Sequence, residues 1–157
     1  MSKDISDSFE QKMYECSKHV EKLHDTKEFL KDIMPLTLET YLEIDKIQSS
    51  FIDQLNFRFT KLQDTIGESI LKGILILFEE DVKKMTFLDI LNRLEGLEVI
   101  QKERWLHLRE IRNEIAHEYS FNQDEVLESI NMIYEKSDEL IAIYFDIVEF
   151  IQKMKNS

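Results

Sequence analysis

A scarcity of helix-breaking residues constrains the fold of this chain more than any other feature. Only three glycines and one proline occur among its 157 residues. The tight turns that join β-strands depend on glycine and proline, whereas long helices with short connections need few of either. We therefore predict an all-α fold. A chain of this length can enclose one hydrophobic core, so residues 1–157 are expected to form a single domain.

Apolar residues recur at steps of three and four along the first half of the chain, as on one face of a helix. The spacing predicts a first helix over residues 4–34, which Pro35 ends. A second helical region is predicted over residues 37–80. A break in that region is expected near residues 49–50 or near Gly67.

Cap signals locate the remaining helices. Three further helices are predicted: residues 86–96, residues 101–118, and residue 122 to about residue 153. Thr86 and Asn122 are N-cap residue types, and Glu125 stands at the third position of the last helix, as in a capping box. Gly96 ends the short helix. Because the connections are too short for crossovers, we predict an up-and-down bundle of four to five helices. Its core should include Phe9, Phe51, Phe59, Phe78, Ile143 and Ile147.

Composition excludes several classes of protein. The net charge of −12 argues against a protein that coats nucleic acid non-specifically, since such binding neutralises phosphates. No apolar run approaches the roughly 18 residues of a membrane span. The N-terminus is charged rather than signal-like, so a cytoplasmic location is expected, without a membrane or DNA partner. The single Cys16 permits no internal disulfide, and neither a zinc motif nor a Gly-rich phosphate loop is present, so no cofactor or metal is expected.

The helix over residues 101–118 carries an arginine where the helical wheel places the core. Trp105, Leu108, Ile111, Ile115 and Tyr119 share one arc, and Arg112 falls inside it. A buried guanidinium is costly unless it is paired. Two interpretations stay open: an ion pair with an acid of another helix, such as Asp64 or Asp89, or a cleft that binds an anionic ligand.

A second arc of this helix is polar. Asn113 and His117 lie one turn apart on it, and Ala116 would let another helix approach closely. The arc is consistent with a homodimer surface or with a solvated face. Arg112 and His117 are about 140° apart on an ideal helix, so one undistorted helix cannot point both at one small ligand. A symmetric dimer would remove this difficulty by bringing both pairs into one groove.

Residues 112–119, Arg-Asn-Glu-Ile-Ala-His-Glu-Tyr, match an Arg-x4-His-x-Tyr motif. This motif resembles that of the HepT-like toxins in the HEPN superfamily. Residues 57–64, 88–95 and 108–114 also resemble stretches of one HepT-like branch. The resemblance covers about residues 50–150 of the expected HEPN-like domain, whereas the helix over residues 1–34 adds no motif.

The resemblance implies a homodimeric toxin that cuts RNA at a cleft between protomers. It further implies an antitoxin of the MNT nucleotidyltransferase type, which transfers AMP to the motif tyrosine, here Tyr119. RNA carries its own nucleophile, the 2′-hydroxyl, so such an endoribonuclease needs no metal. A histidine titrates near neutral pH, which suits His117 for proton transfer, and a guanidinium suits Arg112 for phosphate stabilisation.

Two further residues complete the predicted site. Asn113 would be an auxiliary hydrogen bonder, and Arg109, one turn earlier, is a candidate RNA contact without family support. His19, His24 and His107 are expected to be exposed helix residues without a role. Two alternatives remain: a non-catalytic nucleotide- or substrate-binding partner of a nucleotidyltransferase, and a purely structural bundle in which the motif is incidental.

Overall fold

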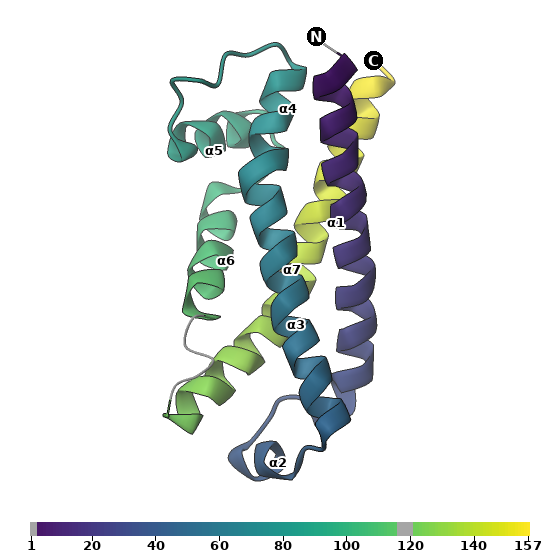
Figure 1. Ribbon diagram of the computed structural model, residues 1–157. Helices are drawn as coiled ribbons and strands as arrows, with labels where there is room; N and C mark the ends of the chain where they lie inside the picture. The colour runs from purple at the N-terminus through teal and green to yellow at the C-terminus, as the bar shows by residue number, and fades with distance from the viewer. Residues whose placement is uncertain (1–2, 116–120) are drawn as a thin grey trace.

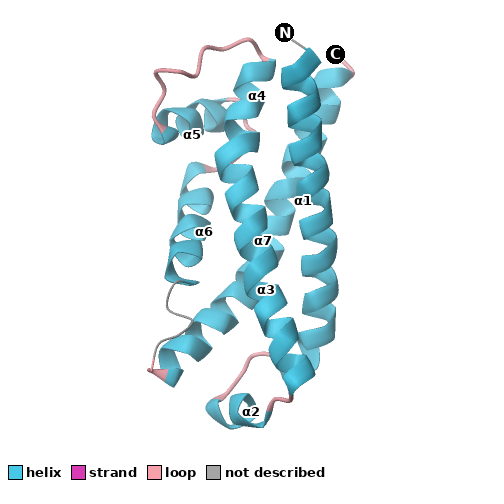
Figure 2. Cartoon of the chain, viewed as in Figure 1, coloured by secondary structure: helices cyan, strands magenta, loops and turns pink. Residues whose placement is uncertain are grey.

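The computed structural model describes residues 3–115 and 121–157. Every regular element in these two ranges is helical (Figure 2), which confirms the predicted all-α class. The helices are α1 (Lys3–Leu30), α2 (Leu38–Glu43), α3 (Lys46–Thr65), α4 (Leu71–Leu77), α5 (Phe87–Gly96), α6 (Lys102–Glu114) and α7 (Gln123–Lys155). A 3-10 turn, η1 (Lys31–Ile33), follows α1, and a π-helical turn, η2 (Ile66–Ile70), joins α3 to α4.

The long helices alternate in direction along an elongated bundle (Figure 1). α1 packs mainly against α3, and α7 packs against α1, α3 and α6. α3, η2 and α4 form one nearly continuous rod, and both chain termini lie at its α4 end. The short α5 lies across that end between α4 and α6, whereas α2 closes the opposite end. Within the described ranges, none of the helices is long and apolar enough to cross a membrane.

The described chain has more helices than the four to five expected, because α2 and α3 are separate. Ile44 is extended, and Asp45 then starts α3 with a capping box: its carboxylate accepts from the backbone N–H of Gln48, whose side chain accepts from the N–H of Asp45. The predicted break at residues 49–50 is wrong. Ser50 lies inside α3, where its hydroxyl donates to the carbonyl oxygen of Lys46. Near Gly67, the alternative position, the α-helix is interrupted as expected, by the π-helical turn η2, although the chain stays helical there.

Both predicted N-caps are confirmed. The hydroxyl of Thr86 accepts from the backbone N–H of Asp89, whose carboxylate accepts from the N–H of Thr86. The side-chain oxygen of Asn122 accepts from the backbone N–H groups of Asp124 and Glu125. These caps supply partners for N–H groups that a helix start leaves unpaired.

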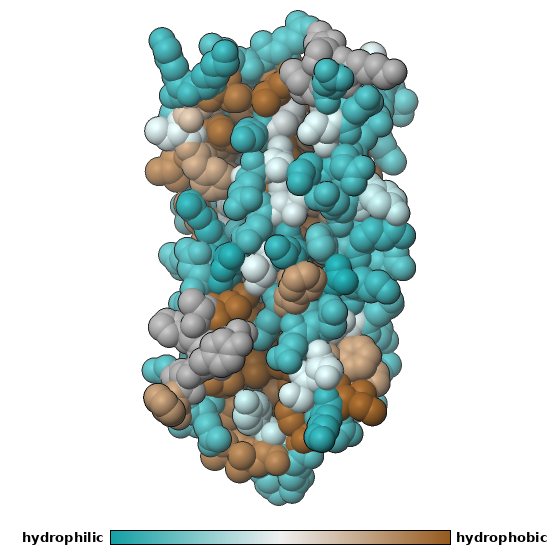
Figure 3. Space-filling model, in the orientation of Figure 1, coloured by the Kyte–Doolittle hydropathy of each residue, from teal (hydrophilic) through white to brown (hydrophobic). Residues whose placement is uncertain are grey.

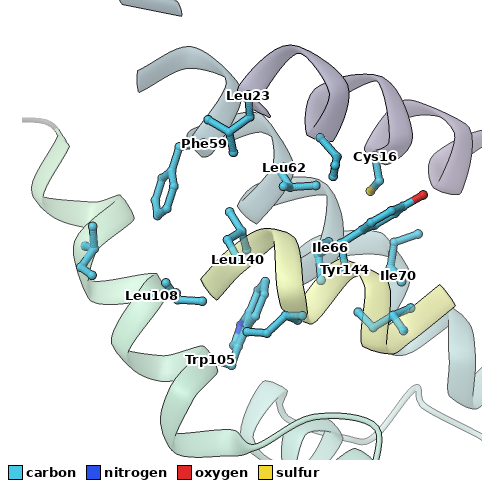
Figure 4. Close-up of a cluster of buried hydrophobic side chains, with 14 of the residues drawn as sticks. Cys16, Leu23, Phe59, Leu62, Ile66, Ile70, Trp105, Leu108, Leu140 and Tyr144 are labelled. Carbon is cyan, nitrogen blue, oxygen red and sulfur yellow. The ribbon is translucent and has the colours of Figure 1, made fainter. Parts of the chain in front are cut away.

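The predicted core is confirmed at four of its six residues: Phe9, Phe59, Ile143 and Ile147 are buried. Figure 4 shows the centre of this core, where side chains of α1, α3, α6 and α7 meet. Phe51 is only half-buried and stacks on Phe29, with ring centroids 3.8 Å apart. The placement of Phe78 is wrong, because α4 ends at Leu77 rather than at residue 80. Phe78 forms its C-cap and is 41% exposed.

Gly73 permits a close approach of α1 to α4. A Cβ atom at this position would lie 2.7 Å from Cδ2 of the buried Phe9 ring, a distance too short without movement. Gly73 is therefore a packing residue.

Candidate functional site

Arg112 and Asn113, the first two residues of the motif, lie in the last turn of α6. Trp105, Leu108 and Ile111 are buried on its inner face, as the helical wheel predicts. Ile115 is half-buried, and its N–H bonds to the carbonyl oxygen of Arg112. The inner face therefore fixes the rotation of α6 about its axis.

The remaining motif residues cannot be located in the same way. His117, predicted for proton transfer, and Tyr119, predicted as the AMP acceptor, lie outside the described residues, as does Ala116. The described helix ends at Glu114, so the predicted extension to residue 118 also falls on this undescribed segment.

Arg112 forms a two-point ion pair with Asp64 of α3. Its Nε donates to Oδ1 at 2.8 Å and its Nη2 donates to Oδ2 at 3.0 Å. The hydrogen bonds that Arg112 donates to Asp64 raise the pKa of Arg112 further above its ordinary value. Of the two acids proposed as partners, Asp64 is confirmed, whereas Asp89 caps α5. The guanidinium is also less buried than the wheel implied, since the Arg112 side chain is 32% exposed.

The ion pair lies in an open groove of about 660 Å³ between the end of α3, η2, α5 and α6. Arg109, Arg112 and Asn113 all line this groove, so the structure brings together the three described members of the predicted site. The bonds to Asp64 use Nε and Nη2 of Arg112. Among the described residues the Nη1 group has no hydrogen-bond partner, so it is a donor that an anion in the groove could meet.

The wall of the groove is shaped by Trp105 and Gly67. The indole of Trp105 is fully buried, and a Cβ at Gly67 would lie 3.1 Å from its Cζ2 atom. Glycine therefore lets η2 pass closely over the ring. The indole Nε1 is buried, and no described residue gives it a hydrogen-bond partner. π-Helical turns inside α-helices often mark functional sites, and this one adjoins Asp64 directly.

Charges of both signs line the groove. Lys72, Arg109 and Arg112 stand against Asp64 and Glu68. The guanidinium of Arg109 lies 4.9 Å from the ring centroid of Phe87, which orients an otherwise exposed side chain. Three cations against two carboxylates make this groove locally basic in a chain whose net charge is −12.

Sequence reasoning named Asp64 only as a possible partner and did not find Glu68 or Lys72. The four-residue step from Asp64 to Glu68 and from Glu68 to Lys72 places the three on one helical face, and this signal could have found them.

Three histidines and the cysteine lie outside the groove. His19 is half-buried rather than exposed as expected, and Arg58 donates from Nη1 to its Nδ1 at 3.0 Å. His24 and His107 are exposed, as predicted. Burial raises the pKa of the Cys16 thiol to about 12, which leaves it a poor nucleophile.

Across residues 3–115 and 121–157, no three histidine, cysteine or acidic side chains gather in a way that could hold a metal ion.

Neither a protein-family model, nor a curated protein, nor a solved structure matches the chain. The residues of the motif and the groove around Arg112 are therefore the features that bear on function.

Proposed function

We propose that this protein is a metal-independent endoribonuclease, the toxin of a HEPN/MNT toxin–antitoxin pair that acts in the cytoplasm. The observation that carries the proposal is the octapeptide of residues 112–119, whose arginine projects from the end of α6 into a groove. Asp64 orients that arginine by two hydrogen bonds and leaves Nη1 for a phosphate.

The residue types suit cleavage by the RNA's own hydroxyl. His117 accepts the proton of the 2′-hydroxyl as its oxygen attacks the adjacent phosphorus. The bond from phosphorus to the 5′-oxygen breaks, and that oxygen takes up a proton as it leaves. Arg112 stabilises the negative charge that builds on the phosphoryl oxygens. Asn113 hydrogen-bonds the phosphate or orients His117, and Arg109 contacts the RNA backbone.

The active form in this proposal is a symmetric homodimer. The angular separation of Arg112 and His117 on one helix is about 140° if the helix continues, which favours a cleft that pools both pairs across the dimer axis. A protein that is monomeric at the concentrations where it cuts RNA would contradict this part of the proposal.

Control of the enzyme would follow from Tyr119. An MNT-type antitoxin would transfer AMP from ATP to the tyrosine hydroxyl with release of pyrophosphate. The added anion, two residues from His117, would occlude the cleft and repel RNA.

The test is incubation of the purified protein with total RNA in EDTA. Wild-type protein should cut RNA under chelation, and His117→Ala and Arg112→Ala should each lose at least about 100-fold of the rate. His107→Ala is the matched control, because His107 is an exposed histidine of α6 outside the motif. Equal cleavage by the His117 and His107 variants, or loss of cleavage in EDTA, would refute the mechanism.

A second candidate function is a non-catalytic nucleotide- or substrate-binding partner of a nucleotidyltransferase. The ion pair itself favours it, because Asp64 already neutralises Arg112 and the chain is acidic overall. Expression without an antitoxin separates the two. A ribonuclease toxin should slow growth and the Arg112→Ala and His117→Ala variants should not, whereas a binding partner would give no difference among the three.

A further inference from the structure

A second groove lies on the other side of the end of α6. It has a volume of about 540 Å³ and is bounded by α2, the first half of α3, Ile115 and the first turns of α7. Its floor is aliphatic, formed in part by Ile52, Val126 and Ile130. Figure 3 shows apolar surface gathered toward this α2 end of the molecule. The size suits a small organic molecule such as a nucleoside.

Asn56 lines this groove, and its side-chain oxygen lacks a partner among the described residues. The residue is 9% exposed, and its Oδ1 atom is buried. A buried acceptor without a donor is unfavourable, and nearly all such groups in folded proteins are paired. A ligand that carries an N–H donor would supply the missing partner once rotation of the side-chain amide brings its oxygen to the groove.

The other polar groups of the groove can all accept a hydrogen bond, since a hydroxyl both donates and accepts and a carboxylate only accepts. Ser49, Asp53, Asn56 and Thr60 all line it, and their steps of four, three and four place them on one face of α3. The carboxylate of Asp53 disfavours an anion at this point. The part of a ligand that enters the groove is therefore uncharged or cationic and rich in donors.

Aromatic side chains of the groove favour a nucleobase over a simple organic cation. Phe57 is 46% exposed, and together with Tyr41 it lines the groove. A base can stack on such a ring. Two cations near the Phe57 ring, Lys61 at 5.8 Å and Arg58 at 5.1 Å from its centroid, are not among the lining residues.

We infer that this groove binds an adenine base, with its exocyclic amino group donating to Oδ1 of Asn56. Asparagine pairs with adenine through two hydrogen bonds, from N6–H to the amide oxygen and from the amide N–H to N7. Arg112 and Asn113 line one groove and Ile115 lines the other, so the end of α6 separates them. In the ribonuclease, and resting on that proposed function, the base would be a nucleotide of the RNA flanking the phosphate at Arg112.

The experiment is a titration of the full-length protein with adenosine, which carries no phosphate, followed by NMR or calorimetry. Adenosine should bind at one saturable site, and uridine should bind at least about tenfold more weakly because it lacks an exocyclic amino group. Asn56→Leu keeps the branched shape and should weaken adenosine at least about tenfold. Asn92→Leu, an exposed asparagine of α5 outside the groove, is the matched control.

Phe57→Ala tests the site independently of the buried position. The residue is exposed, so the variant should fold, and loss of stacking should weaken adenosine about tenfold. The inference fails if adenosine shows no saturable binding, if uridine binds equally well, or if Asn56→Leu and Phe57→Ala both bind like wild type.

Assaying the same preparations for RNA cleavage separates the two proposals. Cleavage without adenosine binding would overturn the base site alone. Adenosine binding without cleavage would overturn the ribonuclease and leave a nucleoside-binding groove.

Discussion

Two cations of this bundle, Lys27 and Arg112, each pair with a carboxylate of another helix, yet their surroundings differ. Lys27 of α1 has a side chain that is 10% exposed. Its Nζ bonds to Asp138 at 2.9 Å and to the carbonyl oxygen of Tyr134 at 2.5 Å, and it lies 4.2 Å from the Tyr134 ring centroid. The Arg112 side chain is 32% exposed, borders an open groove and forms an ion pair with Asp64.

The difference separates a cation that holds the fold from one that can act on a ligand. The ammonium of Lys27 is enclosed by partners from α7, so it joins α1 to α7. Arg112 is oriented by Asp64 but not enclosed, and a planar fork held by one edge can still offer its other edge to a phosphate. An ion pair alone therefore does not show that a cation is structural. What distinguishes the two cations is whether their remaining N–H donors are enclosed or face a groove.

Arg112→Lys should have the largest effect, and it should fall on activity. A lysine keeps the charge but cannot donate to Asp64 at two points and to a phosphate at the same time. We expect the rate of RNA cleavage to fall about 100-fold, with a change in the free energy of unfolding below about 1 kcal/mol, because the pair is partly exposed. Wild-type cleavage by this variant would show that Arg112 contributes only charge.

Lys27→Met should show the opposite pattern. The variant keeps the apolar stem of the side chain but leaves the Tyr134 carbonyl oxygen without its donor. The free energy of unfolding, measured by urea denaturation, should fall by about 1–3 kcal/mol, and RNA cleavage at a temperature where the variant is folded should be unchanged. If Lys27→Met loses cleavage while it remains folded, the contrast with Arg112 is lost.

Asp64→Asn should have a smaller effect, about tenfold on the cleavage rate. An amide keeps one acceptor for Arg112 but removes the charge and one of the two hydrogen bonds, so the guanidinium is held less firmly. Asp89→Asn, in the acid that caps α5, serves as the control for a lost surface charge. Faster cleavage by Asp64→Asn would mean that the ion pair restrains Arg112 instead of orienting it.

The smallest expected effect is on the pH dependence of stability. It comes from His19, whose neutral ring is the partner of the cation Arg58. Burial and the neighbouring Arg58 lower the pKa of His19 below 6.5. Below pH 6.5 the unfolded chain binds this proton more readily than the folded chain, so stability should fall as the pH drops through the folded pKa. Urea denaturation at pH 7.5 and pH 5 should show a smaller loss for His19→Gln than for wild type, and equal losses would contradict the assignment.

Local signals in the sequence were sufficient for most of the fold. Thr86 and Asn122 begin helices as their residue types predict, because a cap depends only on backbone atoms within three residues. The capping box at Asp45 has the same local origin, yet the helix break was predicted at residues 49–50 instead. Phe78 was misplaced because an apolar residue at a helix end carries no signal of whether a partner helix reaches it.

The same distinction between local signals and packing between helices holds for the candidate site. The spacing of residues 101–119 placed Trp105, Leu108 and Ile111 on the buried face and raised the question of how Arg112 could be accommodated. The spacing did not distinguish Asp64 from Asp89 as the partner of Arg112, since both are acids on other helices. It gave no sign of the unpaired Asn56 either, because burial of that amide depends on how α2, α3 and α7 pack.

The sequence by itself determined the helical class, most helix starts and the motif at the end of α6. These follow from steps of three and four residues and from caps, which act over one or two turns. Only the tertiary structure decided that Asp64 holds Arg112, that Gly67 admits Trp105 beside η2, and that a groove lies on each side of α6. The ion pair alone joins residues 48 positions apart, and no local pattern specifies how two helices turn their faces toward each other.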